Sequence, residues 1–378
     1  MTQQCETSQF DILIIGAGLS GTCLAHVLSR ASIRSCVIDQ KEVYPENFRA
    51  DKLEYNQIAA FREFGLDQFI VPRAEPIGTI QSFEHGTVND IDTIDQYGFA
   101  YTKSVNKLRE NLPDNAKIVI GKVAKCTTGP DRQTITLKDG RCIAGRLLVI
   151  ATGGGGSQLV GQLGLKRKTQ DELTSLNFGF DVSLLDGSDF KFNGFNYHAE
   201  QQTSGVNYVT FFPIGNTMKV NIFTQWDASD SRTKAMRANP LEEMNLYFKE
   251  LKKYTGELKL LSKVQVFPTA YYRIHDRNKD GVIVIADEFQ SVSPATGKGL
   301  DKLTTDIRLL CNTYIPTWLK SKTITAKDIK KYYSDPQKEK CDLSAYSDWV
   351  YYRNLSRGYG FNLAEKITFR LKTILNKF

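Results

Sequence analysis

Three glycines near the N-terminus have the spacing of a phosphate-binding turn. Gly16, Gly18 and Gly21 follow an apolar run at residues 12–15 and precede a helical pattern at residues 22–30. The first glycine permits a tight turn, the second lets a pyrophosphate approach the backbone, and the third lets the helix pack on the strand. The helix then offers its free N–H groups and positive dipole end to the phosphates. The segment predicts a bound adenine dinucleotide, and the alternative is a purely structural glycine turn.

An acidic residue ends the second predicted strand. A short apolar run at residues 36–38 is followed by Asp39. A carboxylate at this place accepts hydrogen bonds from the ribose hydroxyls of a dinucleotide. Strand, helix, strand and terminal acid together are a much stronger signal than the glycine spacing alone. Three neighbouring residues are also assigned to the cofactor: Leu19, Ser20 and Gln40.

A second segment joins a buried strand to a loop and a helix. An apolar run at residues 281–285 precedes a loop rich in proline and glycine. The positions of interest are Ala286, Asp287, Pro294, Gly297, Lys298, Gly299 and Leu300. With the N-terminal motif, this segment resembles the para-hydroxybenzoate-hydroxylase-type flavoproteins, which include group A monooxygenases, geranylgeranyl reductases and flavin-dependent halogenases. Their second signature is Gly-Asp, a short spacer, Pro, two residues, Gly-x-Gly and a helix. The resemblance spans the framework from Asp11 to about Leu310, although only a few short motifs carry it.

The resemblance implies FAD as cofactor and gives several residues a role. Asp287 would bond the ribityl chain, and Pro294 would lie beside the isoalloxazine ring. The helix that starts at Gly297 to Gly299, with Leu300, would point its positive end at the flavin, where the reduced form is anionic. Arg49 would lie over the pyrophosphate. The alternatives are a helix or turn cap for Asp287 and a solvated surface charge for Arg49.

Two departures from the family pattern affect these assignments. Ala286 replaces the glycine of Gly-Asp, which is a mild change if the backbone is in an ordinary conformation. The Asp-Gly motif of the hydroxylases is replaced by Ala151-Thr152-Gly153, as in the reductase and halogenase branches, and Gly153 is assigned to the cofactor. NAD(P)H remains the expected electron donor, but no second glycine fingerprint supplies a nicotinamide domain.

Candidate residues at the reacting end are Pro294, Lys298 and Phe212. Lys298 lies between two glycines, where it could approach the flavin or a substrate carboxylate, and the alternative is a solvated lysine. An aromatic motif at residues 208–213 supplies Tyr208, Phe211 and Phe212 as pocket candidates, or else is a core strand that ends at a proline. Tryptophan halogenases need a lysine in the first third of the chain. No lysine lies between residues 53 and 102, which weakens that interpretation.

The order of the predicted elements indicates an α/β fold of Rossmann type. The FAD-binding domain would consist of residues 1–70, 98–160 and 276–315. A β-rich substrate domain would be inserted at residues 71–97 and 161–275, since residues 175–275 have an antiparallel pattern interrupted by one helix near residues 240–254. Residues 316–378 would form a helical C-terminal region.

Composition and charge narrow the class of protein further. The 378 residues carry a net charge of +7, which arises within residues 318–378, where 13 Lys and Arg face six Asp and Glu. The rest of the chain is balanced, which argues against a nucleic-acid-binding protein. The seven cysteines and four histidines are dispersed, so neither a metal site nor a disulfide framework is expected. Without a secretion signal or a membrane-spanning run, the protein is expected in the cytoplasm with reduced thiols.

The end of the chain has an amphipathic pattern at residues 361–378. Apolar residues recur there at steps of three and four, and basic residues cover much of the remaining surface. Such a helix most often docks on its own domain. The alternatives are contact with anionic lipid as a peripheral membrane protein, with an acidic carrier protein, or as a lid over a lipid-like substrate.

The sequence therefore predicts an FAD-dependent monooxygenase. A flavin C4a-hydroperoxide would transfer an oxygen atom to a small organic substrate, which could be lipid-like or carrier-bound. The alternatives are an alkene reductase similar to geranylgeranyl reductase, a flavin-dependent halogenase, and a flavin- or nucleotide-binding protein with a regulatory or carrier role.

Overall fold

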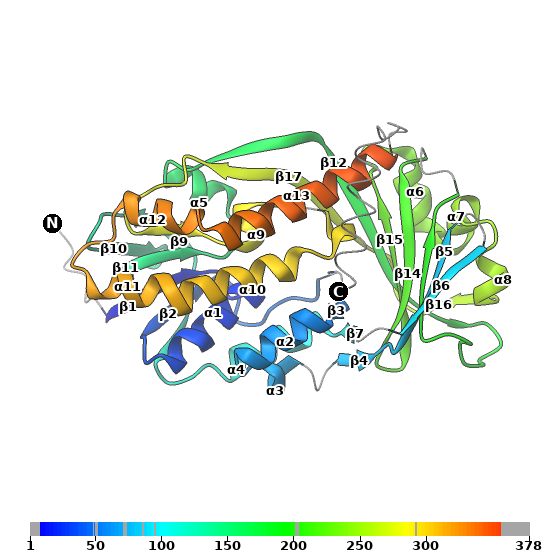
Figure 1. Ribbon diagram of the computed structural model, residues 1–378, viewed down its shortest axis with the longest axis horizontal. Coiled ribbons are helices and arrows are strands. Elements are labelled where there is room, and N and C mark those ends of the chain that lie inside the picture. Colours follow the sequence, from blue (N-terminus) through cyan, green and yellow to red (C-terminus); the bar gives the residue numbers. More distant parts are fainter. Residues whose placement is uncertain are drawn as a thin grey trace.

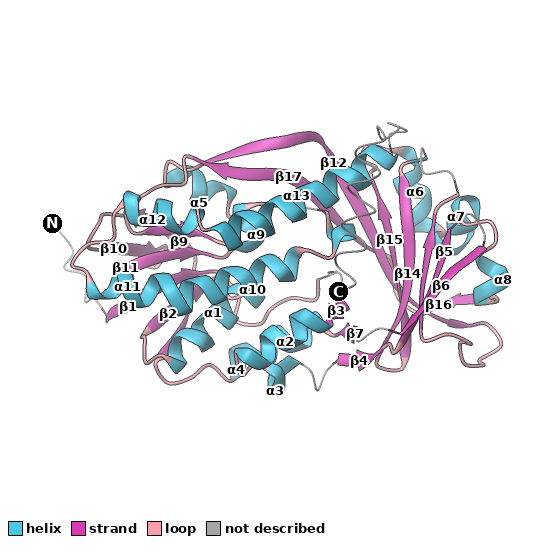
Figure 2. Cartoon of the chain, in the orientation of Figure 1, coloured by secondary structure: helices cyan, strands magenta, loops and turns pink. Residues whose placement is uncertain are grey.

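The chain forms two lobes that share long strands (Figure 1). A computed structural model describes residues 8–47, 49, 52–70, 74–84, 87–93, 96–200, 204–291 and 293–356. One lobe contains a mostly parallel sheet with helices against it, and the other contains an antiparallel sheet (Figure 2). The predicted α/β class, with a β-rich part and helices at the C-terminal end, is confirmed.

The first sheet has seven strands and holds the glycine motif. Its order is β8-β2-β1-β11-β10-β9, and β18 pairs with the end of β11. The central strands β2, β1 and β11 run parallel. Residues 12–14 of β1 are fully buried, as expected of a parallel strand covered on both faces. The bounds are β1 (Ser8–Ile15), β2 (Ser35–Asp39), β8 (Ala116–Ile120), β9 (Val123–Thr127), β10 (Gln133–Leu137), β11 (Cys142–Ile150) and β18 (Val282–Val284).

The second sheet has eight strands and is mainly antiparallel. Its order is β16-β12-β15-β14-β13-β5-β6, and β17 pairs with β12. The long strands β12 and β17 run from this sheet to the other lobe (Figure 1). The bounds are β5 (Thr79–Glu84), β6 (Thr87–Thr93), β12 (Lys166–Leu184), β13 (Gly194–His198), β14 (Val206–Ile214), β15 (Thr217–Thr224), β16 (Leu258–Leu260) and β17 (Gln265–His275).

A small third sheet lies between the lobes. It consists of β3 (Lys52–Glu54), β7 (Gln96–Phe99) and β4 (Ala74–Pro76), with β7 in the middle. Gly98 of β7 lets this sheet approach the second one, because a Cβ atom there would collide with the carbonyl oxygen of Pro213 in β14. The position of β3 is thus fixed against the end of β14.

Helices cover both large sheets. In the first lobe α1 packs on β2 and also contacts α10, and in the second lobe α6, α7 and α8 close an aromatic core (Figure 1). The bounds are α1 (Leu19–Arg30), α2 (Tyr55–Glu63), α3 (Asp67–Ile70), α4 (Tyr101–Glu110), α5 (Ser157–Gln162), α6 (Ser231–Ala238), α7 (Pro240–Tyr247), α8 (Leu251–Thr255), α9 (Ala286–Phe289), α10 (Gly299–Leu309), α11 (Ile315–Lys320), α12 (Ala326–Tyr333) and α13 (Pro336–Ser356). A short 3₁₀ turn, η3 (Pro294–Thr296), precedes α10, and a π-helical turn, η4 (Leu310–Tyr314), follows it.

Two expectations about the elements were wrong. The single helix expected near residues 240–254 is two helices, α7 and α8, and α6 precedes them. Asp230 caps α6, and Pro240 starts a new helix at α7. Cys142 is disulfide-bonded, although reduced thiols were expected throughout.

The amphipathic pattern at residues 361–378 lies outside the described residues. Within the part of the chain that the structure describes, no helix is long and apolar enough to cross a membrane.

Candidate active site

The glycine turn between β1 and α1 leaves one side open. Gly16 has a φ of +107°, and a Cβ atom there would lie 2.5 Å from the carbonyl oxygen of Ala151. A Cβ atom on Gly21 would collide with the carbonyl of Gly16. Gly18 differs, since the nearest atom to its Cβ position is a ring carbon of Tyr44 at 3.7 Å. The first and third glycines are therefore required by the fold, whereas the second leaves space for a ligand.

The start of α1 is free to bind an anion. Gly18 provides no side-chain cap, and the first turn contains no acidic residue, so its N–H groups have no partner from a capping side chain. Asp39, at the end of β2, accepts hydrogen bonds from the N–H groups of Ala17 at 2.8 Å and Lys41 at 2.9 Å. These bonds fix its carboxylate against the glycine turn. Gln40 follows it and is exposed.

Arg49 lies inside the molecule. Its guanidinium is centred 4.5 Å from the ring of Phe267 and 6.0 Å from that of Tyr101, and its Nε is buried without a hydrogen-bond partner. Burial lowers the pKa of Arg49, but Tyr101, Tyr44 and Asp287 outweigh this effect and raise the pKa above its usual value. Arg49 therefore stays charged and keeps a free donor, which is not the environment of a solvated surface residue.

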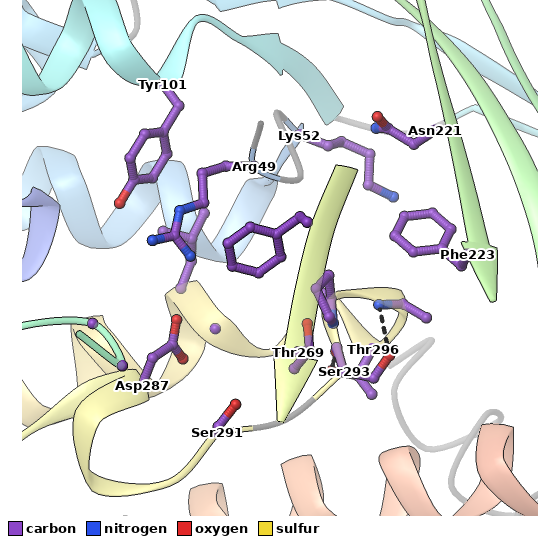
Figure 3. Close-up of a pocket in the computed structure, with 18 of the residues that line it drawn as sticks. Arg49, Lys52, Tyr101, Asn221, Phe223, Thr269, Asp287, Ser291, Ser293 and Thr296 are labelled. Atoms are coloured by element: carbon purple, nitrogen blue, oxygen red, sulfur yellow. Dashed lines mark hydrogen bonds between the residues drawn. The ribbon is translucent and has the colours of Figure 1, made fainter. Parts of the chain in front are cut away.

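Asp287 faces Arg49 across a cavity (Figure 3). Its side chain is 42% exposed, and Oδ1 lies 3.6 Å from the ammonium of Lys302. The preceding Ala286 has a φ of +52°, in the left-handed region. Alanine would be a mild change here only with an ordinary backbone conformation, and the structure does not meet that condition. The conformation is the one that glycine adopts at low cost, and the N–H of Ala286 donates to Asp306 Oδ2 at 2.7 Å.

The loop from Pro294 to Gly299 forms one wall of the cavity. Gly297 has a φ of +66°, and α10 then begins without a side-chain cap. Lys298 is not among the cavity-lining residues, because its ammonium turns to Asp301 at 3.3 Å. The structure therefore gives Lys298 no contact with the cavity. Pro294, Gly297, Gly299 and Leu300 do line it.

One face of the second sheet forms the opposite wall. Successive strand residues point to opposite faces, so Tyr208 and Phe212 line the cavity while Phe211 packs into the core behind the sheet. The assignment of Phe211 to the pocket was wrong for this reason. The Tyr208 hydroxyl donates to the carbonyl of Ala295 at 2.7 Å and so joins the two walls. Burial raises the pKa of Tyr208 well above its usual value, so this hydroxyl stays protonated.

The walls enclose one cavity of about 630 Å³. Figure 3 shows Arg49, Tyr101 and Asp287 towards one end and Lys52, Asn221 and Phe223 towards the other, with Thr269, Ser291 and Ser293 along the side. Leu19, Ser20 and Gly153 lie at the end next to α1. The cavity thus runs from the glycine turn to the antiparallel sheet.

A family model decides what kind of site this is. The model of the FAD binding domain matches residues 9–314. The chain belongs to this FAD-binding family. The resemblance to para-hydroxybenzoate-hydroxylase-type flavoproteins is thereby confirmed, and FAD is the expected cofactor.

Individual relatives match over a smaller part of the sequence. An FAD-dependent monooxygenase, ctvC of Aspergillus terreus, is 26% identical over 156 residues, which are 38% of this chain and 33% of that protein. The chromoplastic capsanthin/capsorubin synthase of Capsicum annuum is 28% identical over 153 residues, 39% of this chain and 28% of that protein. The matches span about a third of the length of these relatives.

Solved structures of related fold match almost the whole chain. The p-nitrophenol 4-monooxygenase PnpA of Pseudomonas putida has a TM-score of 0.72 at 15% identity, covering 95% of this chain and 92% of that one. The flavin-dependent brominase Bmp2 has a TM-score of 0.72 at 13% identity, covering 98% and 99%. At such identities the likeness shows a shared fold.

The residues present fit FAD. The open side at Gly18 and the uncapped start of α1 suit a pyrophosphate, and the charged Arg49 lines the same cavity. Asp287 offers carboxylate oxygens as acceptors for ribityl hydroxyls. The uncapped N-terminus of α10 supplies a positive dipole end beside Pro294 and Gly297.

Glu288, which was not predicted as a site residue, organises the run of four glycines. This residue is fully buried, and Oε2 accepts from the Thr152 hydroxyl at 2.5 Å and from the N–H groups of Gly154 at 3.0 Å and Gly156 at 3.1 Å. Arg167 pairs with its other oxygen. Its place next to Asp287 in the sequence was the only available signal.

Lys52 is a second residue of the site that was not predicted. This residue lies one position before the segment that contains no lysine, and its side chain lines the cavity (Figure 3). Absence of a lysine from residues 53–102 is therefore no argument against a lysine in this site.

Proposed function

We propose that this protein is an FAD-dependent monooxygenase that inserts one oxygen atom into a small organic substrate, with NAD(P)H as electron donor. The observation that carries the proposal is the cavity of about 630 Å³, which joins a wall suited to FAD with an aromatic and polar wall on the antiparallel sheet. When bound, FAD would supply the redox chemistry, since it takes up electrons from the donor and activates molecular oxygen once reduced.

The chain's own residues would provide binding, electrostatic stabilisation and exclusion of water. The start of α10 favours negative charge near Pro294 and Gly297 because its N–H groups lack a side-chain cap. Phe212 and Phe223 are almost fully buried, and with Phe267 they give the cavity apolar surfaces. Such surfaces keep bulk water from the reacting groups and bind a flat organic molecule.

The test is a rapid-mixing experiment on the purified protein. FAD content is confirmed first, the flavin is reduced without oxygen, and oxygen is then admitted while spectra are recorded. A transient spectrum that differs from both reduced and oxidised flavin supports the monooxygenase. Direct return of oxidised flavin, with and without candidate substrates, would contradict it.

The alternatives give different outcomes in related assays. An alkene reductase would oxidise its reduced flavin with an alkene in the absence of oxygen. A halogenase would need chloride or bromide for turnover, and the position of Lys52 in the cavity makes this control necessary. NADH and NADPH are compared as donors in the same preparation.

The contact of residues 361–378 with a membrane or an acidic carrier protein stays a prediction, as does the cytoplasmic location. Truncation after Gly358 is expected to abolish binding to anionic liposomes or to the carrier while FAD is retained. Loss of folded protein on truncation would instead show that this segment belongs to the core.

A further inference from the structure

Lys52 is a charged residue held inside the cavity. In β3 the neighbouring Leu53 is fully buried in the core, so Lys52 and Glu54 point to the opposite face, which lines the cavity. Lys52 pairs in register with Gly98, the residue that packs against the carbonyl of Pro213. The backbone of Lys52 is therefore fixed against the antiparallel sheet, and its amine extends towards Phe223 and Asn221 (Figure 3).

The ammonium of Lys52 lacks a counterion in contact with it. It makes no hydrogen bond or ion pair within the part of the chain that the structure describes. Glu54, on the same face, is the carboxylate that acts on it through space. Burial lowers the pKa of Lys52, and Glu54 only partly offsets this effect. Burial of an unpaired cation destabilises the folded protein, and a bound anionic ligand would remove this destabilisation.

Polar groups without partners lie on the wall that Lys52 approaches. Asn196, Thr210 and Asn221 are paired in register across β13, β14 and β15, and all three line the cavity. Thr210 Oγ1 and Asn221 Oδ1 are buried without a hydrogen-bond partner, as is Thr269 Oγ1 on the adjoining wall. Buried polar atoms are normally hydrogen-bonded, so this row is suited to a polar ligand.

The two arginines at the cavity differ from Lys52 in pairing or in position. Arg167 is paired with the buried Glu288, and Arg49 lies at the opposite end, over Phe267 and beside Asp287. The end of the cavity next to the antiparallel sheet therefore has one unpaired cation, Lys52, among its described residues, together with neutral polar groups and aromatic rings. This set suits an organic molecule with one anionic oxygen group.

We propose that Lys52 binds the anionic oxygen group of an organic acid substrate, and that the Thr210 hydroxyl and the Asn221 side-chain N–H group donate further hydrogen bonds to the same end of that molecule. Lys52 thus determines which substrates the cavity accepts. The inference rests on the monooxygenase proposed above, in that it names the chemical class of its substrate.

The experiment compares acids with neutral molecules of the same shape. Binding of benzoate, benzamide, hexanoate and hexanamide to the full-length protein is measured by titration calorimetry with FAD saturating. At least one acid is expected to bind tenfold or more tightly than its amide. Lys52→Met should remove this preference, Lys52→Arg should retain it, and Lys259→Met, an exposed lysine on β16, should leave it unchanged.

Two further measurements distinguish a role of Lys52 in binding from a loss of folding or of cofactor. Thermal unfolding is recorded for each variant, and Lys52→Gln, which also removes the charge, replaces Lys52→Met if that variant does not fold. A preference for acids that persists in Lys52→Met overturns the inference, and binding through Arg49 would give this result. The absence of any preference in the unaltered protein overturns it too. Flavin absorbance is measured in the same samples. Lack of bound FAD would refute the proposed function, whereas bound FAD without acid preference refutes only the role of Lys52.

Discussion

At the scale of single residues, the cavity depends on a backbone conformation that its residue type disfavours. Ala286 lies between β18 and Asp287 with a φ of +52°, and its N–H is held by the buried carboxylate of Asp306. An L-residue with a side chain pays roughly 1–2 kcal/mol for the left-handed conformation. This strained conformation turns the chain so that Asp287 faces the cavity.

Ala286→Gly is expected to stabilise the protein by about 0.5 kcal/mol. Relief of the left-handed strain outweighs the roughly 0.5–1 kcal/mol that glycine loses through greater freedom of the unfolded chain. The free energy of unfolding is measured by urea denaturation. The control is Ala144→Gly, in a fully buried position of β11 outside the left-handed region, which should destabilise by about 1 kcal/mol or more. An equal decrease of the free energy of unfolding in both variants would show that Ala286 is not strained.

Asp287→Ala is expected to weaken FAD binding roughly tenfold, because a carboxylate that accepts hydrogen bonds from the cofactor is removed. The buried Lys302 also loses its carboxylate neighbour at 3.6 Å, so the apoprotein should be less stable. Asp287→Asn keeps an acceptor oxygen and should have a smaller effect on FAD. Quenching of flavin fluorescence gives the dissociation constants, and Asp189→Ala, on an exposed loop, is the control. Unchanged FAD affinity in Asp287→Ala would rule out this contact.

At the scale of elements, a buried carboxylate holds the glycine-rich loop against α9. Glu288 accepts bonds from Thr152, Gly154 and Gly156, and pairs with Arg167 of β12. The guanidinium of Arg167 also stacks 4.2 Å from the ring centre of Tyr272 in β17. One residue of α9 thus connects the end of β11 to both long strands that the lobes share.

Glu288→Ala is expected to lower the free energy of unfolding by about 3 kcal/mol, because it leaves Arg167 without its carboxylate and the N–H groups of Gly154 and Gly156 without an acceptor. Glu288→Gln retains acceptor capacity and should cost less. Arg141→Ala removes an exposed ion pair with Asp139 and should change stability little. Urea denaturation distinguishes these outcomes. If Glu288→Ala lowers the free energy of unfolding no more than Arg141→Ala does, the role of Glu288 is contradicted.

The elements differ in how far the sequence could predict them. The turn from β1 to α1 and the Asp287 loop are local patterns, so strand, glycines and helix could be recognised together. The partners of Glu288 are 121 to 136 residues away, and no local pattern reveals them. Phe211 and Phe212 necessarily face opposite sides of β14, but both faces are lined with aromatic residues. The alternation therefore could not tell which of the two faces the cavity.

At the scale of the whole molecule, α13 ties the two lobes together. Near its start, Lys338 donates to Asp306 of α10 at 2.7 Å and lies 3.4 Å from Asp342. Near its end, Tyr352 and Ser356 accept hydrogen bonds from Asn207 of β14 at 3.2 and 2.6 Å. Figure 1 shows this helix running from the first lobe to the antiparallel sheet. The cavity walls belong to different lobes, so their spacing depends on such connections.

Lys338→Met should destabilise the protein by about 3 kcal/mol at pH 8, and by less at pH 5.5. Lys338 is fully enclosed, and its removal leaves buried carboxylates without their cation. Burial already raises the pKa of Asp342, and Lys338 acts against this effect, so the variant raises that pKa further. An acid whose pKa is higher in the folded than in the unfolded state takes up protons on folding, so its unfavourable effect grows as pH rises through the folded pKa and fades towards acid.

Urea denaturation of the unaltered protein and of Lys338→Met at both pH values gives the two differences in stability. If Lys338 acts by neutralising buried carboxylates, the difference should be smaller at the lower pH, because the raised pKa of Asp342 favours its protonation, which removes the unpaired charge that the variant creates. Lys340→Met, an exposed neighbour on α13, should show no dependence of this kind. The ammonium of Lys338 also lies 4.4 Å from the centre of the Phe289 ring. A difference in stability that is equal at both pH values, or larger at pH 5.5, would mean that Lys338 stabilises α13 by packing on Phe289 and not by neutralising carboxylates.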